Sequence, residues 1–190
     1  MLPVNELKMD NSLAEQNEFE FSKPHARFIG IGGVSRSGKT FLGQILAQNI
    51  TNSVLISQDL YVPVESDIPE IKGHTDWERP EAIDWQSLKS EMNRAGNTMS
   101  TVIVEGLLVF SKKSIFEYFD KTIFITLSEA EFRKRKRKDL RWGKEPEWYI
   151  DHIWKSHLKY GQLPQELKDT MIINGEEDFE IEEILSYILT

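Results

Sequence analysis

Eight consecutive residues carry the clearest chemical signal in this sequence. They match the pattern G-x-x-x-x-G-K-[ST] and comprise Gly33, Val34, Ser35, Arg36, Ser37, Gly38, Lys39 and Thr40. Glycines at these positions let backbone N–H groups curl around a phosphate group without a Cβ in the way. Lys39 can reach the terminal phosphates of a nucleotide, and the Thr40 hydroxyl can bind Mg²⁺. Because the segment lies between a strand pattern and a helix pattern, we interpret it as a nucleotide-binding loop.

Two acids follow predicted strands near this loop. Asp59 comes shortly after the apolar run Val54–Ile56, and Glu105 ends the buried run Val102–Val104. Because the carboxyl ends of parallel strands meet at one edge of a sheet, both carboxylates should lie beside the phosphate loop. There Asp59 can accept a proton from an attacking hydroxyl, and Glu105 has the usual position of an acidic Mg²⁺ ligand. The alternative for Asp59 is an exposed loop acid or a helix cap.

A basic run indicates a third functional element. Residues 133–138 are all Lys or Arg, and Arg141 follows. Such a run is usually a solvated face or a nucleic-acid patch, but a formal net charge of −8 argues against a dedicated nucleic-acid binder. Phosphoryl transfer develops charge that arginines on a closing lid neutralise. We therefore predict a lid over about residues 133–149, with Arg135, Arg137 and Arg141 directed at the phosphates.

The elements that position these residues alternate between strands and helices, which is typical of a parallel sheet. Strands are predicted at about residues 28–31, 53–57, 101–104, 121–127 and 171–173. Helices are predicted after the phosphate loop, over 84–95 with a stop at Gly96, from Ser128 with a capping box, from Pro146 to Gly161, and around 181–188. This order predicts an α/β fold of the P-loop NTPase type: a five-stranded parallel sheet with helices on both faces (an α/β/α sandwich) and a small helical lid.

Two segments are less regular. Residues 60–80 contain prolines, glycine and several acids, and they are expected to form a long loop or lid. In the helix from Pro146, the stripe that should face the core comprises Ile150, Ile153, Trp154 and Leu158. Residues 1–25 are polar and acidic, so we expect a partly disordered N-terminal extension ahead of a P-loop kinase domain over 26–190.

Composition limits the class of protein. The chain has 190 residues, which suits a single core, and none is Cys, which excludes disulfides and thiolate metal sites. No stretch reaches the roughly 18–20 apolar residues that a membrane span needs, and no secretion signal is visible. The four histidines lack metal-ligand spacing, and we expect them to be surface or packing residues. These features predict a cytoplasmic, globular protein, a monomer or weak homo-oligomer, with no membrane or nucleic-acid partner.

The motifs resemble the nicotinamide riboside kinases, within the wider group of uridine and pantothenate kinases. The resemblance spans most of residues 27–190 and involves the phosphate loop, Ile56–Asp59, Trp77–Asp84, Val104–Phe110, Tyr149–Trp154 and Leu158–Tyr160. It implies phosphorylation of the 5′-hydroxyl of nicotinamide riboside with ATP and Mg²⁺, with nicotinic acid riboside as a co-substrate. By the same resemblance, Asp59 contacts the ribose hydroxyl and Glu105 acts through Mg²⁺. Trp77 stacks on the pyridine ring, and Glu78 holds the ribose hydroxyls.

The chain departs from the family pattern at several positions. Glu78 and Leu60 stand where the family has Asp and a second acid, and the stretch 141–146 is shortened. In that stretch Trp142 can supply a second ring against the pyridine, and Glu145 an acid. In the wider group the position of Asn174 and Gly175 borders the adenine ring, although a plain strand-to-helix turn is an equal alternative.

Other functions remain open on the sequence. A kinase for another small nucleoside, such as uridine, would share Asp59, Glu105 and the phosphate loop. A nucleotide-binding sensor without phosphate transfer is disfavoured because it need not retain the proposed base. A GTPase is set aside, since the sequence has no Asn-Lys-x-Asp signature after a strand and no Asp-x-x-Gly segment for a second switch.

Overall fold

The computed structural model describes residues 24–141 and 143–190. Its centre is a sheet of five parallel strands in the order β2-β5-β1-β6-β7. These strands are β1 (Arg27–Gly33), β2 (Ser53–Ser57), β5 (Thr101–Glu105), β6 (Lys121–Thr126) and β7 (Thr170–Asn174). All five predicted strands are confirmed. β1 lies between β5 and β6, and β2 lies beyond β5. The order of the strands therefore reverses beside β1, and sheets of this kind bind ligands at the carboxyl ends of the strands where the order reverses.

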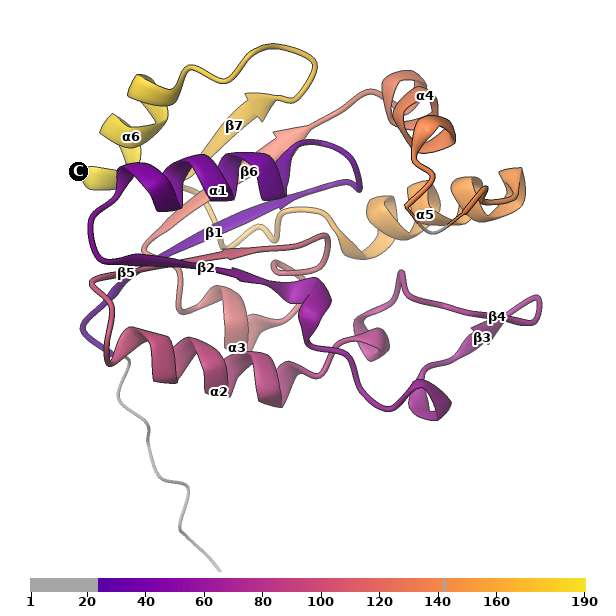
Figure 1. The fold of residues 1–190 in the computed structure, drawn as a ribbon, viewed down its shortest axis with the longest axis horizontal. Coiled ribbons are helices and arrows are strands. Elements are labelled where there is room, and N and C mark those ends of the chain that lie inside the picture. Colours follow the sequence, from indigo (N-terminus) through magenta and orange to yellow (C-terminus); the bar gives the residue numbers. More distant parts are fainter. Residues whose placement is uncertain (1–23, 142) are drawn as a thin grey trace, which may run out of the picture.

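Helices cover both faces of the sheet, as the α/β/α prediction requires (Figure 1). Neighbouring side chains of a strand point to opposite faces. One face packs against α1 (Lys39–Asn49) and α6 (Ile181–Leu189), in a core that includes Ile29, Ile31, Leu42, Leu46, Ile103, Ile184 and Ile188. The other packs against α2 (Trp85–Gly96) and α3 (Lys113–Phe116), in a core that includes Phe28, Leu88, Met92, Val102, Val104, Ile115 and Phe116.

Two further helices, α4 (Glu129–Lys138) and α5 (Glu147–Tyr160), lie at the end toward which the strands run (Figure 1). The predicted cap of α4 is present, because the Ser128 Oγ accepts a hydrogen bond from the Glu131 backbone N–H at 3.2 Å. A third small core joins both helices to the phosphate loop through Val34, Leu127, Phe132, Ile150 and Ile153. This core holds the basic helix beside the nucleotide-binding loop.

The stripe predicted for α5 is wrong at Leu158, which is 54% exposed. His157 is buried instead, because residues 150, 153 and 157 follow the spacing of one helical face. Burial, aided by the positive charge of Lys39, lowers the pKa of His157 to about 4. The ring is therefore neutral at physiological pH, and a neutral histidine occupies the core position expected for a leucine.

The segment predicted as a loop over 60–80 contains a small hairpin. Strands β3 (Glu70–Ile71) and β4 (His74–Thr75) pair antiparallel, and both turn residues, Lys72 and Gly73, have positive φ. The Lys72 ammonium lies 4.9 Å from the Trp148 ring centre, and the His74 ring lies 5.1 Å from it. These contacts hold the hairpin against the start of α5.

Three short 3-10 turns complete the connections, at Gln58–Leu60 (η1), Glu65–Asp67 (η2) and Pro80–Ala82 (η3). The α2 helix includes Gly96, where a stop is predicted, and Asn97 ends it. α3 has no predicted counterpart, because four residues are too few for a helical period. Across the described ranges, no helix is both long and apolar enough to cross a membrane.

Candidate active site

The phosphate loop, from the end of β1 to the start of α1, has the geometry of an anion cradle. Gly33 has φ 142°, and a Cβ there would lie 2.4 Å from the Ile125 carbonyl oxygen, so only glycine fits. The buried Lys39 ammonium donates to the Val34 carbonyl at 2.9 Å across the loop. Within the described residues, the buried Ser37 hydroxyl has no hydrogen-bond partner. A phosphate oxygen would supply the acceptor that this hydroxyl lacks.

Glu105, at the end of β5, lies beside the loop as predicted. One of its carboxylate oxygens accepts hydrogen bonds from the Thr40 hydroxyl at 3.1 Å and the Ser57 hydroxyl at 2.6 Å. Hydroxyl and carboxylate oxygens are the donors that Mg²⁺ prefers, and this ion usually takes one or two carboxylates plus substrate phosphates. The described residues contain no cluster of three or more His, Asp or Glu for a metal. Thr40 and Glu105 therefore fit Mg²⁺ bound together with a nucleotide.

The charges at this edge act on one another. Burial lowers the pKa of Lys39, and the carboxylates of Glu105, Asp59 and Glu78 oppose that shift, while Arg141 adds to it. The charge of Lys39 therefore interacts with the charges of the predicted base, Asp59, the predicted second acid, Glu105, and the predicted ribose-binding acid, Glu78. The sequence analysis predicts phosphoryl transfer at this carboxyl edge of the sheet.

Asp59 is exposed in η1, directly after β2. Its neighbour Gln58 is buried, and the Gln58 side-chain oxygen accepts a hydrogen bond from the Leu108 backbone N–H at 3.0 Å. A Cβ on Gly106 would lie 2.5 Å from this side chain, so the glycine makes room for it. Gln58 therefore fixes the segment after β5 relative to Asp59. The sequence analysis did not identify Gln58. Gly106, directly after Glu105, was the one sign in the sequence that another side chain packs closely there.

The predicted acceptor residues follow the hairpin. Trp77 is 42% exposed, and Glu78 is half-buried. Burial raises the pKa of Glu78 to about 7; the nearby acids Asp59, Glu145 and Asp76 contribute to the rise, and Lys136 opposes it. Glu78 therefore titrates near neutrality, among several carboxylates whose charges act on it.

Glu145, one of these carboxylates, forms an ion pair that the sequence analysis did not identify. The buried Lys136 ammonium lies 2.9 Å from the Glu145 carboxylate. The second Glu145 oxygen and the Tyr149 hydroxyl are buried and lack hydrogen-bond partners among the described residues. Burial and the neighbouring Glu78 raise the pKa of Tyr149 above its ordinary value. Trp142, predicted as the second ring, lies outside the described residues.

An Asp–His pair fixes the acceptor segment to α5. Asp76 is buried, and one of its oxygens lies 2.7 Å from the His152 ring nitrogen Nε2 and 3.3 Å from the Glu78 backbone N–H, which donates to it. Asp76 therefore connects the backbone of Glu78 to the helix. Neither partner was predicted, since 76 positions separate them in the chain.

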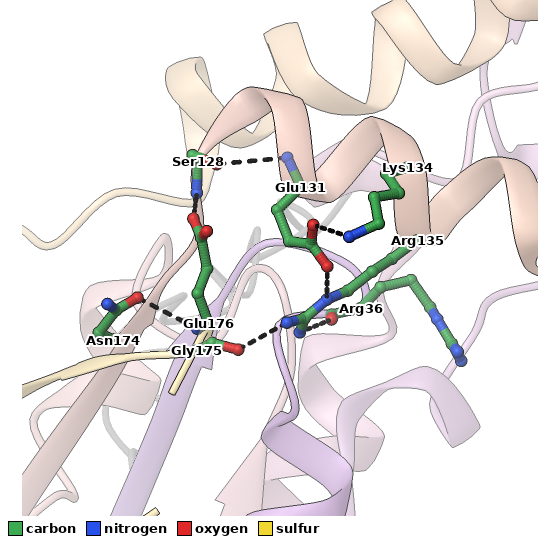
Figure 2. Close-up of polar contacts among 8 residues, drawn as sticks. All are labelled: Arg36, Ser128, Glu131, Lys134, Arg135, Asn174, Gly175 and Glu176. Atoms are coloured by element: carbon green, nitrogen blue, oxygen red, sulfur yellow. Dashed lines mark hydrogen bonds and ion pairs between the residues drawn. The ribbon is translucent and has the colours of Figure 1, made fainter. Parts of the chain in front are cut away.

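Arg135 connects three parts of the predicted nucleotide site (Figure 2). Its guanidinium donates to the Gly175 carbonyl at 2.9 Å and the Arg36 carbonyl at 3.3 Å, and it pairs with Glu131 at 2.9 Å. The Asn174 side-chain oxygen accepts from the Glu176 backbone N–H at 3.1 Å. Glu176 in turn accepts from the Ser128 backbone N–H at 3.0 Å, so the β7–α6 turn is also fixed to the start of α4.

The other two lid arginines differ. Arg141 forms a bidentate pair with the buried Asp139 at 2.7 and 2.9 Å, and Arg36 lies 3.7 Å from the same carboxylate. The hydrogen bond from Arg141 holds the pKa of Asp139 well below its usual range. Arg137 instead pairs with the exposed Glu147 at 2.8 Å and makes no hydrogen bond to the phosphate loop in the part of the chain that is described.

Gly175 packs closely against the loop. A Cβ there would lie 2.7 Å from the Ser37 carbonyl oxygen and 2.9 Å from that of Thr126. The glycine is therefore required by close approach of the β7–α6 turn to the phosphate loop. Phe179 and Phe41 lie on the same side, with ring centres 6.2 Å apart, and Phe41 is 61% exposed.

Known proteins resemble this chain over most of its length. It is 28% identical over 156 residues to nicotinamide riboside kinase 1 of Homo sapiens, covering 73% of this chain and 78% of the relative. It is 26% identical over 180 residues to the uridine kinase of Borreliella burgdorferi (strain ZS7), covering 79% and 87%. A sugar kinase from Janibacter sp. HTCC2649 shares the fold with a TM-score of 0.59 at 22% identity, over 86% of this chain and 94% of that one. No family model matches the chain.

The relatives carry the names of the group that the motifs indicate, so the predicted resemblance is confirmed. The fold is the P-loop NTPase fold of kinases. The relatives support a phosphotransferase of the nucleoside kinase type that uses ATP.

Proposed function

We propose that this protein transfers the γ-phosphoryl group of ATP to the 5′-hydroxyl of nicotinamide riboside, and also of nicotinic acid riboside. The product mononucleotide would enter pyridine nucleotide synthesis in the cytoplasm. One observation carries the proposal: the buried Lys39 shares its electrostatic environment with Asp59, Glu105 and Glu78. The proposed phosphate-binding cation, proton acceptor and ribose-binding acid are thus close enough for their charges to act on Lys39.

In the proposed reaction, the loop N–H groups and Lys39 hold the β- and γ-phosphates. Asp59 accepts the proton of the 5′-hydroxyl as the new O–P bond forms, and ADP leaves with the electron pair of the broken bond. Mg²⁺ bound by Thr40 and Glu105 would neutralise phosphate charge. Arg141, held by Asp139, supplies positive charge from the lid side. Positioning and electrostatics account for most of the catalysis, since little covalent help is needed.

The acceptor residues support a riboside with a cationic ring. The exposed face of Trp77 suits a flat pyridinium, which gains about 0.5–2 kcal/mol from such a contact. Glu78 can accept hydrogen bonds from two neighbouring ribose hydroxyls. The Glu145 oxygen that lacks a partner among the described residues is a second acceptor, and its charge acts on Glu78. Trp142 remains the proposed second ring.

Uridine is the competing acceptor, because the chain is also similar to a uridine kinase. Uridine has the same ribose and 5′-hydroxyl but a neutral base. It would therefore use Asp59 and Glu78 without the charge attraction to Trp77.

The test is ADP release with ATP, Mg²⁺ and one riboside at a time. Nicotinamide riboside should give the highest kcat/KM, nicotinic acid riboside a measurable rate, and Asp59→Ala should abolish both. Turnover with uridine alone would reject the proposed acceptor and retain the chemistry. ATP binding without turnover on any riboside would reject the kinase and favour a nucleotide sensor.

A further inference from the structure

A second hollow, separate from the phosphate loop, lies between the hairpin segment and α5. Its volume is about 310 Å³. α5 contributes His152, Lys155, Ser156 and Lys159, which are spaced i, i+3, i+4 and i+7 and so share one helical face. The hairpin segment contributes Ile71, Asp76 and Arg79. Lys39, Asp59 and Glu105 do not line this hollow, so it is separate from the phosphate loop, although it shares Asp76 and His152 with the acceptor segment.

The charge of this pocket is opposite to that of the protein. Arg79, Lys155 and Lys159 are cationic in a chain of net charge −8. The one acid in the lining is Asp76, whose carboxylate is already engaged by His152 and by the Glu78 N–H. Within the described ranges, neither lysine has a carboxylate within ion-pair distance; the Lys155 charge acts on Asp151 without an ion pair.

The cationic groups are partly held in place. The Lys159 ammonium lies 4.6 Å from the ring centre of Tyr160, which also lines the pocket. The Arg79 guanidinium forms a two-point pair with Glu81 at 3.1 and 3.3 Å. Such exposed pairs contribute little to stability, so a stronger anion can compete for the arginine. Ile71 and the Tyr160 ring supply an apolar wall beside the charges.

From this arrangement we infer that the pocket binds a small phosphate-bearing anion. An arginine fork and two ammonium groups from one helical face match a phosphate group, which accepts several charge-assisted hydrogen bonds. The buried Ser156 hydroxyl also lines the pocket; among the described residues its one hydrogen-bond contact is to His152 at 3.5 Å, and it is a further donor. The organic part of a phosphate ester would lie on Tyr160 and Ile71.

The experiment measures anion binding by titration calorimetry and ³¹P NMR with the phosphate loop filled. The full chain is saturated with Mg²⁺ and a non-hydrolysable ATP analogue, then titrated with inorganic phosphate or with ribose 5-phosphate. The test variant is Lys155→Gln with Lys159→Gln. The matched control is Lys112→Gln with Lys168→Gln, which removes the same charge from two exposed lysines without ion pairs among the described residues.

We expect the test variant to weaken binding about tenfold or more and the control to leave it within about twofold. Binding of both probes would identify the phosphate group itself as the ligand, and binding of ribose 5-phosphate alone would identify phosphate esters. Absence of binding to the nucleotide-filled protein would overturn the inference. Equal binding by test and control variants would also overturn it, because the anion would then occupy another place, such as the acceptor pocket. Riboside turnover of the test variant, measured in parallel without added anion, reports on folding.

Discussion

The two halves of the candidate site are built in different ways. The donor half is formed by consecutive residues of one loop, Gly33–Thr40, whose backbone geometry and one lysine make the cradle. The acceptor half is formed by side chains from three separate segments: Asp76–Glu78, Lys136 on α4, and residues 145–152 before and within α5. The donor half therefore depends on local conformation, and the acceptor half on tertiary contacts.

This difference separates chemistry from specificity. The phosphate groups are the same whichever acceptor is used, so a rigid backbone cradle suits them. Ribosides differ in shape and charge, and a pocket of side chains on a hairpin and a helix can change without disturbing the loop. Substitutions in the donor half should therefore reduce turnover with every acceptor. Substitutions in the acceptor half should alter the KM for the riboside and leave the KM for ATP unchanged.

After the complete loss expected for Asp59→Ala, the largest effect is expected on the donor side, from Lys39→Met in the loop and from Glu105→Gln beside it. Each should lower kcat about 10²–10³-fold, because in the proposed reaction Lys39 binds the terminal phosphates and Glu105 would hold the Mg²⁺ that neutralises them. The loss should be equal for nicotinamide riboside and for any slower riboside. Steady-state rates with two acceptors measure it. A loss confined to one acceptor would contradict the separation of the halves.

The donor half was predictable from the sequence because its information is local. The spacing of Gly33, Gly38 and Lys39 specifies the loop, and Glu105 was found because it ends a buried strand of a parallel sheet. Asp59 was predicted at the same edge of the sheet because it closely follows another apolar strand. Strand periodicity likewise predicted the five-stranded sheet, since each strand carries its own apolar run.

The acceptor half was only partly predictable. Trp77 and Glu78 were inferred through the family resemblance, whereas Asp76, Lys136, Tyr149 and His152 act through contacts between distant segments that no spacing encodes. The short hairpin at 70–75 is too small to show a strand period. Leu158 was assigned to the core because it is apolar, but helical geometry puts His157 there.

The next largest effect should come from the Asp76–His152 pair. In His152→Gln, loss of the buried contact to Asp76 frees the Glu78 segment, at a cost of about 1.5–3 kcal/mol. The KM for the riboside should rise about tenfold or more, with the KM for ATP within about twofold. His74→Gln is the matched control, since that ring contacts Trp148 and Tyr149 on the same hairpin interface. Equal effects from both variants would indicate general loosening of the hairpin.

Glu78 should give the acceptor half a pH dependence that the donor half lacks. Its pKa is raised to about 7, so the carboxylate form that accepts ribose hydroxyls is lost as pH falls below 7. The kcat/KM for the riboside should drop about tenfold for each further pH unit, since one proton is bound. Glu78→Gln should flatten this profile at a lower rate, and ATP binding should follow neither change.

The raised pKa of Glu78 affects the stability of the fold in the direction opposite to its effect on kcat/KM. Between about pH 4.5 and 7 the folded protein keeps a proton on Glu78 that the unfolded chain has lost. This contribution to the free energy of unfolding is therefore present at low pH and is lost as pH rises through 7. Thermal denaturation of Glu78→Gln should lack that decline relative to the wild type. A decline of the same size in both proteins would assign it to another group.

The smallest effect is expected at the boundary of the halves, in the lid. Arg137 pairs with the exposed Glu147, and exposed pairs contribute about 0–1 kcal/mol, so Arg137→Gln should change kcat and both KM values by less than about twofold. Arg141→Gln is the matched comparison, because the buried Asp139 holds that arginine and its charge reaches Asp59. It should lower kcat by about tenfold, since in the proposed reaction its charge stabilises the transferring phosphate. A larger loss for Arg137→Gln than for Arg141→Gln would mean that the lid rotates on binding ATP and exchanges the two arginines. The lid arginines would then act on the phosphates only after the lid has closed.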